Sequence, residues 1–320
     1  MQTMNFQAIP SPKGPEEKGD LGFGAVVSSS SGRLLNADGS FNVRRSGLPW
    51  SEAVSVYHAA LVVRWPVFLG YVALIYLAIN LLFAGLYYAA GAGALVGSAA
   101  ETIGGRFSRS FFFSVETFAT IGYGNLAPSG ALAHFVMTIE ALVGVLAQAL
   151  ITGLFFARFA RPTAAIQFSK RAVIAPFNGG HALMMRLANR RKNELIELEA
   201  QLTYSFVEQT TSGLQRRYRP LKLDRAKVTF FPLAWTIVHP ITPDSPLWGL
   251  STEQLEERAA EFLLLVSGVD ETFASTVHAR TSYRAKEVAW GSKFTNIFDA
   301  PGEDGVLTMD ISRLDEVAAR

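Results

Sequence analysis

Two long apolar stretches that almost lack charge constrain this chain more than any other feature. No Asp, Glu, Lys or Arg occurs between residues 65 and 100, and residues 66–90 are long enough to cross about 30 Å of hydrocarbon as a helix. A second stretch runs from about residue 131 to residue 157 and contains one carboxylate, Glu140. We therefore expect two membrane-spanning helices.

The composition agrees with a membrane part joined to a soluble part. The mean hydropathy of +0.22 is too high for an average soluble protein and low for a chain that lies entirely in a membrane. Cysteine is absent, which excludes disulfides, thiolate metal sites and a cysteine nucleophile. A net charge of +2 is too balanced for a dedicated nucleic-acid binder, so no nucleic-acid partner is expected.

Basic residues place both ends of the membrane part on the cytoplasmic side. They flank the outer ends of the two stretches, at Arg44, Arg45, Arg64, Arg158 and Arg161. Residues 1–45 are rich in Gly, Ser and Pro and lack the apolar core of a signal peptide. Such a composition cannot bury enough apolar surface to offset the entropy of ordering, so we expect a flexible tail.

Beyond residue 161 the pattern changes to short stretches that are typical of β-strands. Apolar and polar residues alternate from residue 194 to residue 205, which predicts a half-buried strand. Further strands are expected at residues 181–188, 214–223, 234–239, 261–268, 273–283 and 306–311. The sequence Ser-Thr-Glu-Gln from Ser251 is a capping box and predicts the start of a helix. Many short strands at close spacing favour an immunoglobulin-like β-sandwich over residues 162–320.

A short segment between the two stretches carries the chemistry. Its first part, from residue 111, is predicted to be a short apolar helix, and its last five residues are Thr120, Ile121, Gly122, Tyr123 and Gly124. A dehydrated cation needs several oxygens at once, and backbone carbonyls supply them when successive residues direct them to one axis. The two glycines tolerate the backbone conformations that this requires. The threonine adds a hydroxyl at the inner end, and the isoleucine and tyrosine side chains then pack outward.

Thr-Ile-Gly-Tyr-Gly resembles the Thr-Val-Gly-Tyr-Gly selectivity filter of potassium channels. Phe-Phe-Phe-Ser-Val-Glu-Thr at residues 111–117 is similar to the pore helix of the KirBac family, the bacterial inward-rectifier potassium channels. Further segments resemble that family's inner-helix end and cytoplasmic domain, at residues 152–162, 173–179, 244–247 and 279–283. The resemblance covers residues 45–315 or so. It implies two transmembrane helices, a re-entrant pore helix and a cytoplasmic immunoglobulin-like β-sandwich.

The resemblance also implies a potassium-selective channel made of this chain and three identical subunits. A filter ring needs four such segments and this chain has one, which supports a homotetramer independently. The expected location is a bacterial inner membrane, crossed more than once with both termini cytoplasmic. No cofactor is implied, and K⁺ is the permeant ion, bound at Thr120, Ile121, Gly122 and Tyr123.

Roles along the pore domain, residues 65–161, follow from the same resemblance. Residues 46–64 correspond to a slide helix at the membrane surface, with an amphipathic helix packed on protein as the alternative. Glu116 lies behind the filter, where Glu140 is expected to share a proton or a water molecule with it. A structural hydrogen-bond role for this pair is favoured over ion binding. Leu126 stands where animal relatives carry a basic partner for Glu116.

Two positions on the second stretch are assigned to the conduction path. Gln148 falls at the position that faces the cavity and controls rectification, so its neutral amide predicts weak block by polyamines or Mg²⁺, while Ba²⁺ is a further candidate blocker. Phe156 is expected to close the inner end of the pore as an apolar ring that gates by dewetting. Phe155 is the alternative gate, and a third possibility is that either ring faces lipid.

Charged residues outside the filter are candidates for lipid and ion contacts. Five basic residues are expected either to bind anionic lipid head groups or to determine topology alone, namely Arg64, Arg158, Arg161, Lys170 and Arg171. Glu197, on the polar face of its strand, matches an acidic residue that faces the cytoplasmic pore, with a solvated surface carboxylate as the alternative. Glu271 belongs to a loop that matches the ring around this pore.

Two alternative functions stay open from the sequence, and a third is disfavoured. One is a cation channel with a similar pore, relaxed selectivity and a ligand-binding gate on the β-domain, which the ratio of K⁺ to Na⁺ flux would distinguish. The other is a membrane-anchored enzyme. The soluble region disfavours an enzyme because it contains no HExxH, Gly-x-Ser-x-Gly or P-loop motif. A tethered binding module would leave the filter sequence without a purpose.

Overall fold

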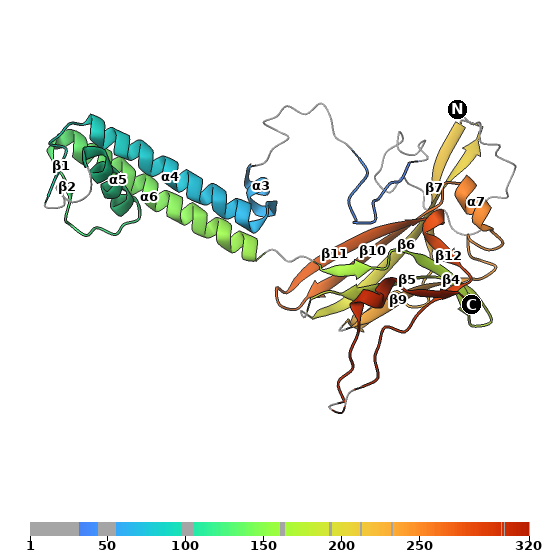
Figure 1. The fold of residues 1–320 in the computed structure, drawn as a ribbon. Helices are drawn as coiled ribbons and strands as arrows, with labels where there is room; N and C mark the ends of the chain where they lie inside the picture. Colours follow the sequence, from blue (N-terminus) through green and yellow to red (C-terminus); the bar gives the residue numbers. More distant parts are fainter. Residues whose placement is uncertain are drawn as a thin grey trace. The chain divides into compact units, whose positions relative to one another are not determined.

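The computed structural model describes residues 32–43, 56–97, 105–160, 164–191, 194–211, 213–231, 233–301, 303 and 305–319. They divide into two compact units. One lies within residues 46–161, and the other joins the residues up to 45 to those from 162 onward. Long helices gather in the first unit and strands in the second (Figure 1).

Two long apolar helices dominate the first unit, α4 (Trp65–Ala89) and α6 (Gly130–Phe159). Both are long and apolar enough to cross a membrane, as the sequence predicted. Pro66 lies in the first turn of α4. Backbone N–H groups there have no partner within the helix, so the N–H that proline lacks is not missed. The remaining elements are α3 (Val56–Val62), α5 (Gly105–Phe118) and the short antiparallel pair β1 (Leu95–Val96) and β2 (Ala127–Pro128).

The shorter helix α5 packs between the two long ones through a small apolar core. This core consists of Phe83, Tyr87, Leu95, Phe113, Leu126 and Val136. Leu126, for which the sequence predicted no pairing with Glu116, is buried in it. Most apolar side chains of α4 and α6 remain exposed in the single chain. Such helices, apolar all round, have surface left for lipid or for further copies.

The second unit is a β-sandwich of two five-stranded sheets. One sheet has the order β11 (Ser275–Arg284), β10 (Glu261–Asp270), β6 (Leu195–Thr210), β7 (Gly213–Leu221), with β8 (Lys227–Phe230) also paired to β6. The other has the order β12 (Val288–Trp290), β4 (Ala172–Phe177), β5 (Gly180–Asn189), β3 (Ile166–Phe168), with β9 (Ala234–Ile241) also paired to β5. The predicted sandwich is confirmed.

The core between the sheets follows from the alternation seen in the sequence. On β6, Leu198, Leu202 and Tyr204 are buried while Glu197 and Gln201 are exposed, as predicted. Neighbouring β10 buries its own alternate residues, which are Phe262, Leu264 and Val266. The capping box at Ser251 is also present and begins helix α7 (Thr252–Glu257).

One expected strand is wrong, at residues 306–311. The structure has an irregular segment there, followed by the 3-10 helix η3 (Ile311–Asp315). The Asp310 side chain accepts a hydrogen bond from the Ser312 N–H at 2.9 Å, and Leu314 is fully buried. A cap followed by a buried anchor favours a helical turn over continued extension. The last strands are β13 (Ser292–Phe294) and β14 (Val317–Ala319), which pair with each other.

The expected flexible tail is also wrong for residues 32–43, which pack on the sandwich. Leu34 and Leu35 are 3% and 4% exposed. Their backbone N–H groups donate to the buried carboxylate of Glu261 at 2.9 and 3.1 Å. Arg216 donates to the carbonyl of Gly32 at 2.8 Å. Two apolar side chains and a charged acceptor therefore anchor a segment whose composition alone suggested disorder.

A buried histidine on β9 has a fixed tautomer. The Nδ1 atom of His239 lies 2.7 Å from the carbonyl oxygen of Lys222, and Nε2 lies 2.8 Å from the Ser245 hydroxyl. Because a carbonyl oxygen only accepts, Nδ1 carries the hydrogen and Nε2 accepts from Ser245. Burial lowers the pKa of His239 from its ordinary value of 6.5.

This histidine predicts acid sensitivity of the sandwich. Below about pH 6.5 the unfolded chain binds a proton at this imidazole that the folded chain excludes, so the free energy of unfolding falls as the pH falls. We expect the Tm of the detergent-solubilised protein to drop between about pH 7.5 and about pH 5.5, and less steeply in His239→Asn. The exposed His278→Asn is the matched control and should keep the parent slope. Parallel pH profiles for His239→Asn and the parent would refute the assignment.

Candidate functional site

The segment after α5, residues 120–124, has a backbone that alternates in handedness. The φ angle is +57° at Thr120, +61° at Gly122 and +78° at Gly124, whereas the two residues between them have ordinary negative values. Alternating left- and right-handed residues turn successive peptide groups toward the same side, which is how backbone dipoles gather on one ion. The glycines therefore occupy the conformations for which the sequence suggested them.

The left-handed conformation of Thr120 was not foreseen from the sequence. A β-branched residue rarely adopts a positive φ. Two backbone hydrogen bonds tie this turn to the end of α5: the Thr120 N–H donates to the Thr117 carbonyl at 3.1 Å, and the Ile121 N–H to the Glu116 carbonyl at 2.8 Å. The helix end thus imposes the conformation, and sequence pattern alone gave no signal of it.

The side chains of the filter segment have much free surface in the single chain. Tyr123 is 74% exposed and Ile121 is 46% exposed. The outward packing expected for these two side chains is therefore not made within the single chain. The filter segment of one chain can place backbone carbonyl oxygens on only one side of a cation, whereas a complete cation site surrounds the ion with oxygens.

A buried polar cluster joins α4, α5 and α6 behind the filter. The Tyr87 hydroxyl donates to Oε2 of Glu140 at 2.7 Å, and Oε1 of Glu140 contacts the Ser114 hydroxyl. The Ser114 hydroxyl also lies 3.1 Å from Oδ1 of Asn80. The expected sharing of a proton between Glu140 and Glu116 is therefore not present in the single chain. Residues 114 and 116 lie about 200° apart around α5, so Glu116 points away from this cluster.

Helix α6 passes close to the end of α5 at Gly144. A Cβ atom at this position would lie 2.8 Å from the Phe118 carbonyl oxygen, too close for any side chain. One turn later, Nε2 of Gln148 donates to the same carbonyl at 2.7 Å. The predicted cavity residue thus lies at the inner end of the filter segment, held by the last turn of the pore helix.

The structure separates the two candidate gate residues near the end of α6. The ring of Phe155 lies 5.9 Å from the Trp65 ring and 5.3 Å from the Phe68 ring, between centroids. Phe155 therefore faces α4. Phe156 is 75% exposed and turns to a different side of α6. This arrangement favours Phe156 as the side chain that could close a pore between copies.

Arg158 joins the ends of α3 and α6. Its two terminal nitrogens donate to the carbonyls of Ala60 and Val63, the latter at 2.6 Å. Its guanidinium carbon lies 4.6 Å and 4.5 Å from the ring centroids of Trp65 and Phe68. The carbonyls at the end of a helix carry partial negative charge, which a cation satisfies. Arg158, a candidate for lipid binding, thus donates its charged hydrogen bonds to backbone carbonyls of the protein.

The other basic candidates differ in their surroundings. Arg64 is exposed just before α4. In the sandwich unit, Lys170 pairs with Asp315 at 3.0 Å and Arg171 is exposed. Arg161 lies outside the described residues.

The two acidic candidates of the sandwich lie at the same end of one sheet. Glu197 is exposed in a β-bulge of β6, with φ +51°, where the pairing with β10 shifts register beside Gly268. Bulges redirect a side chain out of the regular alternation. Glu271 follows β10, and its N–H donates to the Glu194 carbonyl at 3.2 Å. Strand pairing therefore places these two exposed acids at the same end of the sheet.

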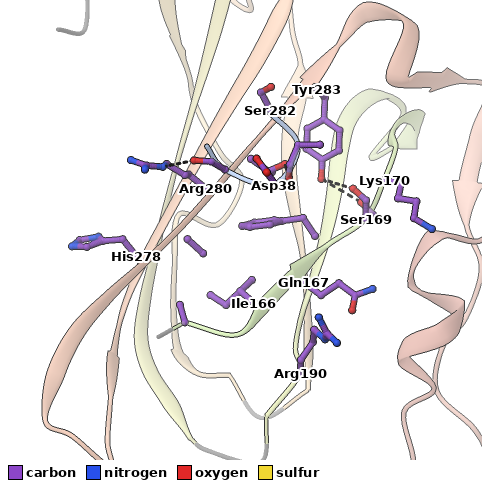
Figure 2. Close-up of a pocket in the computed structure, with 16 residues that line it drawn as sticks. Asp38, Ile166, Gln167, Ser169, Lys170, Arg190, His278, Arg280, Ser282 and Tyr283 are labelled. Atoms are coloured by element: carbon purple, nitrogen blue, oxygen red, sulfur yellow. Dashed lines mark hydrogen bonds between the residues drawn. The ribbon is translucent and has the colours of Figure 1, made fainter. Parts of the chain in front are cut away.

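The sandwich also has a cleft of about 500 Å³ lined by residues 37–39, β3 and β11 (Figure 2). The Tyr283 hydroxyl donates to the Ser169 carbonyl at 2.8 Å beside it. Arg190 and Lys170 lie at its rim. Across the described ranges, no three His, Asp or Glu side chains cluster as a metal site would require.

Comparison with known proteins gives matches over nearly the whole chain. A family model described as the inward rectifier potassium channel transmembrane domain matches residues 35–162, and one described as the C-terminal domain of these channels matches residues 166–319. The chain is 42% identical over 290 residues to the inward rectifier potassium channel Kirbac3.1 of Paramagnetospirillum magnetotacticum, covering 89% of this chain and 96% of that protein. It is 36% identical over 201 residues to human inward rectifier potassium channel 4, covering 59% of this chain and 44% of the human protein.

Proposed function

Because this chain belongs to the inward rectifier potassium channel family, we propose that four copies conduct K⁺ selectively through the backbone carbonyls of residues 120–124. The alternating sign of φ along this segment is the observation that carries the proposal. The family resemblance read from the motifs is confirmed, and with it the combination of a helical membrane part and a β-sandwich. Since the family consists of ion channels, the chain is not an enzyme.

Selective conduction requires that the filter replace the water around the ion. Carbonyl oxygens of residues 120–123 from four copies would surround a K⁺ ion and take the place of its hydration shell. Helix α5 ends at Phe118, directly before the filter. The C-terminal end of a helix carries partial negative charge, which favours a cation on the inner side of the filter. The copies pack their exposed Ile121 and Tyr123 side chains into a supporting layer.

The gate is proposed at the inner end of α6. An exposed Phe156 from each of four helices would form an apolar ring, and a narrow apolar ring excludes water and ions. Gln148 lies between this ring and the filter, where the cavity is expected. The exposed acids Glu197 and Glu271 would continue the cation path through the cytoplasmic domain. The channel would lie in a bacterial inner membrane, with both termini on the cytoplasmic side.

Anionic lipid is the proposed modulator. The exposed Arg64, with Arg161, Lys170 and Arg171, supplies positive charge, and each such residue near an anionic surface is worth about 1 kcal/mol. Arg158 contributes differently, because its donors hold the end of α3 to the end of α6. It would transmit a lipid-induced displacement of α3 to the gate two residues away.

The different surroundings of Arg64 and Arg158 therefore predict different phenotypes. We expect Arg64→Gln to weaken the dependence of K⁺ flux on the mole fraction of phosphoinositide while leaving thermal stability unchanged. Arg158→Gln removes two charged hydrogen bonds and should lower the free energy of unfolding by about 2 kcal/mol, with changed flux at every lipid composition. Flux curves and melting profiles of both variants provide the measurement. Identical behaviour of the two variants would contradict separate roles.

Uptake of Rb⁺ or K⁺ into proteoliposomes tests the proposed function directly. We expect uptake that Ba²⁺ blocks and that greatly exceeds Na⁺ uptake under the same gradient. Equal Na⁺ and K⁺ uptake would favour the second candidate, a cation channel of relaxed selectivity. The cleft beside Tyr283 is the place where a gating ligand of that candidate would bind. Absence of any uptake in correctly assembled tetramers would refute both.

A further inference from the structure

Four polar side chains are fully enclosed in the membrane unit and form one chain of contacts. Asn80, Ser114 and Glu140 are 0% exposed, and Tyr87 is 1% exposed. They come from α4, α5 and α6, so the cluster is the polar link between all three helices. Polar groups enclosed in this way need hydrogens in the right places, because an unsatisfied group in hydrocarbon is costly.

The amide of Asn80 fixes the first hydrogen. Its Nδ2 donates to the carbonyl of Tyr76 at 2.8 Å, so Oδ1 faces Ser114. The reverse orientation of the amide would place two acceptors against each other at Tyr76. Since Oδ1 carries no hydrogen, the contact between Asn80 and Ser114 uses the hydroxyl hydrogen of Ser114.

The remaining two contacts determine the state of Glu140. The Tyr87 hydroxyl supplies the hydrogen for its contact with Oε2. The Ser114 hydroxyl has one hydrogen for two contacts with acceptors, Oδ1 of Asn80 and Oε1 of Glu140, so one of these contacts lacks a hydrogen unless the carboxyl group of Glu140 supplies it. We infer that Glu140 is a neutral carboxylic acid, which donates to Ser114 through Oε1 and accepts from Tyr87 through Oε2.

The charges around Glu140 agree with this assignment. Among the residues that the structure describes, no Lys or Arg forms an ion pair with Glu140, and a lone buried carboxylate in a membrane is strongly disfavoured. Its polar contacts are the hydroxyl groups of Tyr87 from α4 and Ser114 from α5. Arg109, further along α5, donates to the Leu95 carbonyl at 3.4 Å instead. The hydrogen bonds that join α4, α5 and α6 in this cluster thus involve only neutral side chains.

A neutral Glu140 is a positioning residue for the pore helix. It holds Ser114, six residues before Thr120, against both α4 and α6. Each hydrogen bond in the cluster then has one possible donor and one possible acceptor. A neutral Glu140 adds no negative charge behind the filter. Glu116, on the opposite face of α5, is a separate carboxyl group that does not belong to this cluster. The positioning role rests on the proposed function, whereas the protonation state of Glu140 does not.

Infrared spectroscopy tests the protonation state without any measurement of flux. The tetramer in lipid vesicles at neutral pH is expected to show the C=O stretching band of a protonated carboxylic acid that disappears in Glu140→Gln. Glu116→Gln is the matched control and should leave this band in place. Loss of a carboxylate band, instead of the acid band, in Glu140→Gln would overturn the inference. An inactive channel would refute the proposed function but would leave this result interpretable.

Rescue by a conservative variant tests the positioning role. Glutamine donates through its amide nitrogen and accepts through its oxygen, so Glu140→Gln reproduces the neutral pattern, whereas Glu140→Leu removes it. We expect Glu140→Gln to keep the Tm and the ratio of K⁺ to Na⁺ flux close to those of the parent, and Glu140→Leu to lower both. If glutamine were as damaging as leucine, the negative charge would be what matters and the inference would be wrong. Should Glu140→Leu fail to assemble, the infrared comparison still decides the protonation state.

Discussion

Replacement of Gly122 by alanine is expected to abolish the preference for K⁺ over Na⁺. Gly122 has a φ of +61°, and an L-residue in this region is disfavoured by about 1–2 kcal/mol in each of four copies. Apart from its two neighbours, no described residue has an atom within 4 Å of a Cβ placed at Gly122, so within one chain the backbone conformation and not the space for a methyl group determines the effect. A rotated peptide would direct its carbonyl away from the ion and remove an oxygen from each quarter of the ring.

A matched glycine separates this effect from general strain. Gly291, between β12 and β13, has a φ of +63°, and again no described residue other than its neighbours lies within 4 Å of an added Cβ. Gly291→Ala therefore introduces the same strain in the sandwich and should keep the parent ratio of K⁺ to Na⁺ uptake. Both variants are compared in proteoliposomes after a check that each assembles. A Gly122→Ala channel that still prefers K⁺ would show that the filter does not depend on this conformation.

Much of the fold could be predicted because local patterns agree with it. The length and lack of charge of α4 and α6 leave few alternatives to a membrane-spanning helix, and the alternation of β6 sets both a strand and its buried face. In the filter, Gly122 and Gly124 marked the need for positive φ values. These predictions depend on residues that lie close together in the sequence.

The failures share a different physical cause, which is contact between residues far apart in the sequence. Leu34 and Leu35 are ordered by Glu261, more than 200 residues later, so the composition around them indicated a tail. Glu140 finds partners on two other helices, and sequence alone offered Glu116 as the nearest carboxyl group. The sequence around Arg158 cannot distinguish an arginine that binds a lipid phosphate from one that donates to the carbonyls of Ala60 and Val63.

The position of Gln148 predicts the second large effect, on block by cytoplasmic polyamines. Its amide donates to the Phe118 carbonyl at 2.7 Å, so the parent channel presents a neutral side chain that is already satisfied. A carboxylate in Gln148→Glu cannot donate to that carbonyl and is repelled by it, so the side chain turns toward water. Four such carboxylates around one cavity would attract a polyamine cation strongly.

We expect spermine applied from the inside to block Gln148→Glu at least about tenfold more tightly than the parent, a difference of about 1.4 kcal/mol. Voltage-clamped bilayer currents give the measurement. Gln148→Leu is the necessary control, because it loses the hydrogen bond to Phe118 without gaining charge and should stay weakly blocked. Strong block of the parent channel would contradict a neutral cavity, unless Glu197→Gln or Glu271→Gln removed that block. In that case the polyamine would bind at the acidic end of the sandwich sheet, and the same currents would assign the block to the cytoplasmic domain.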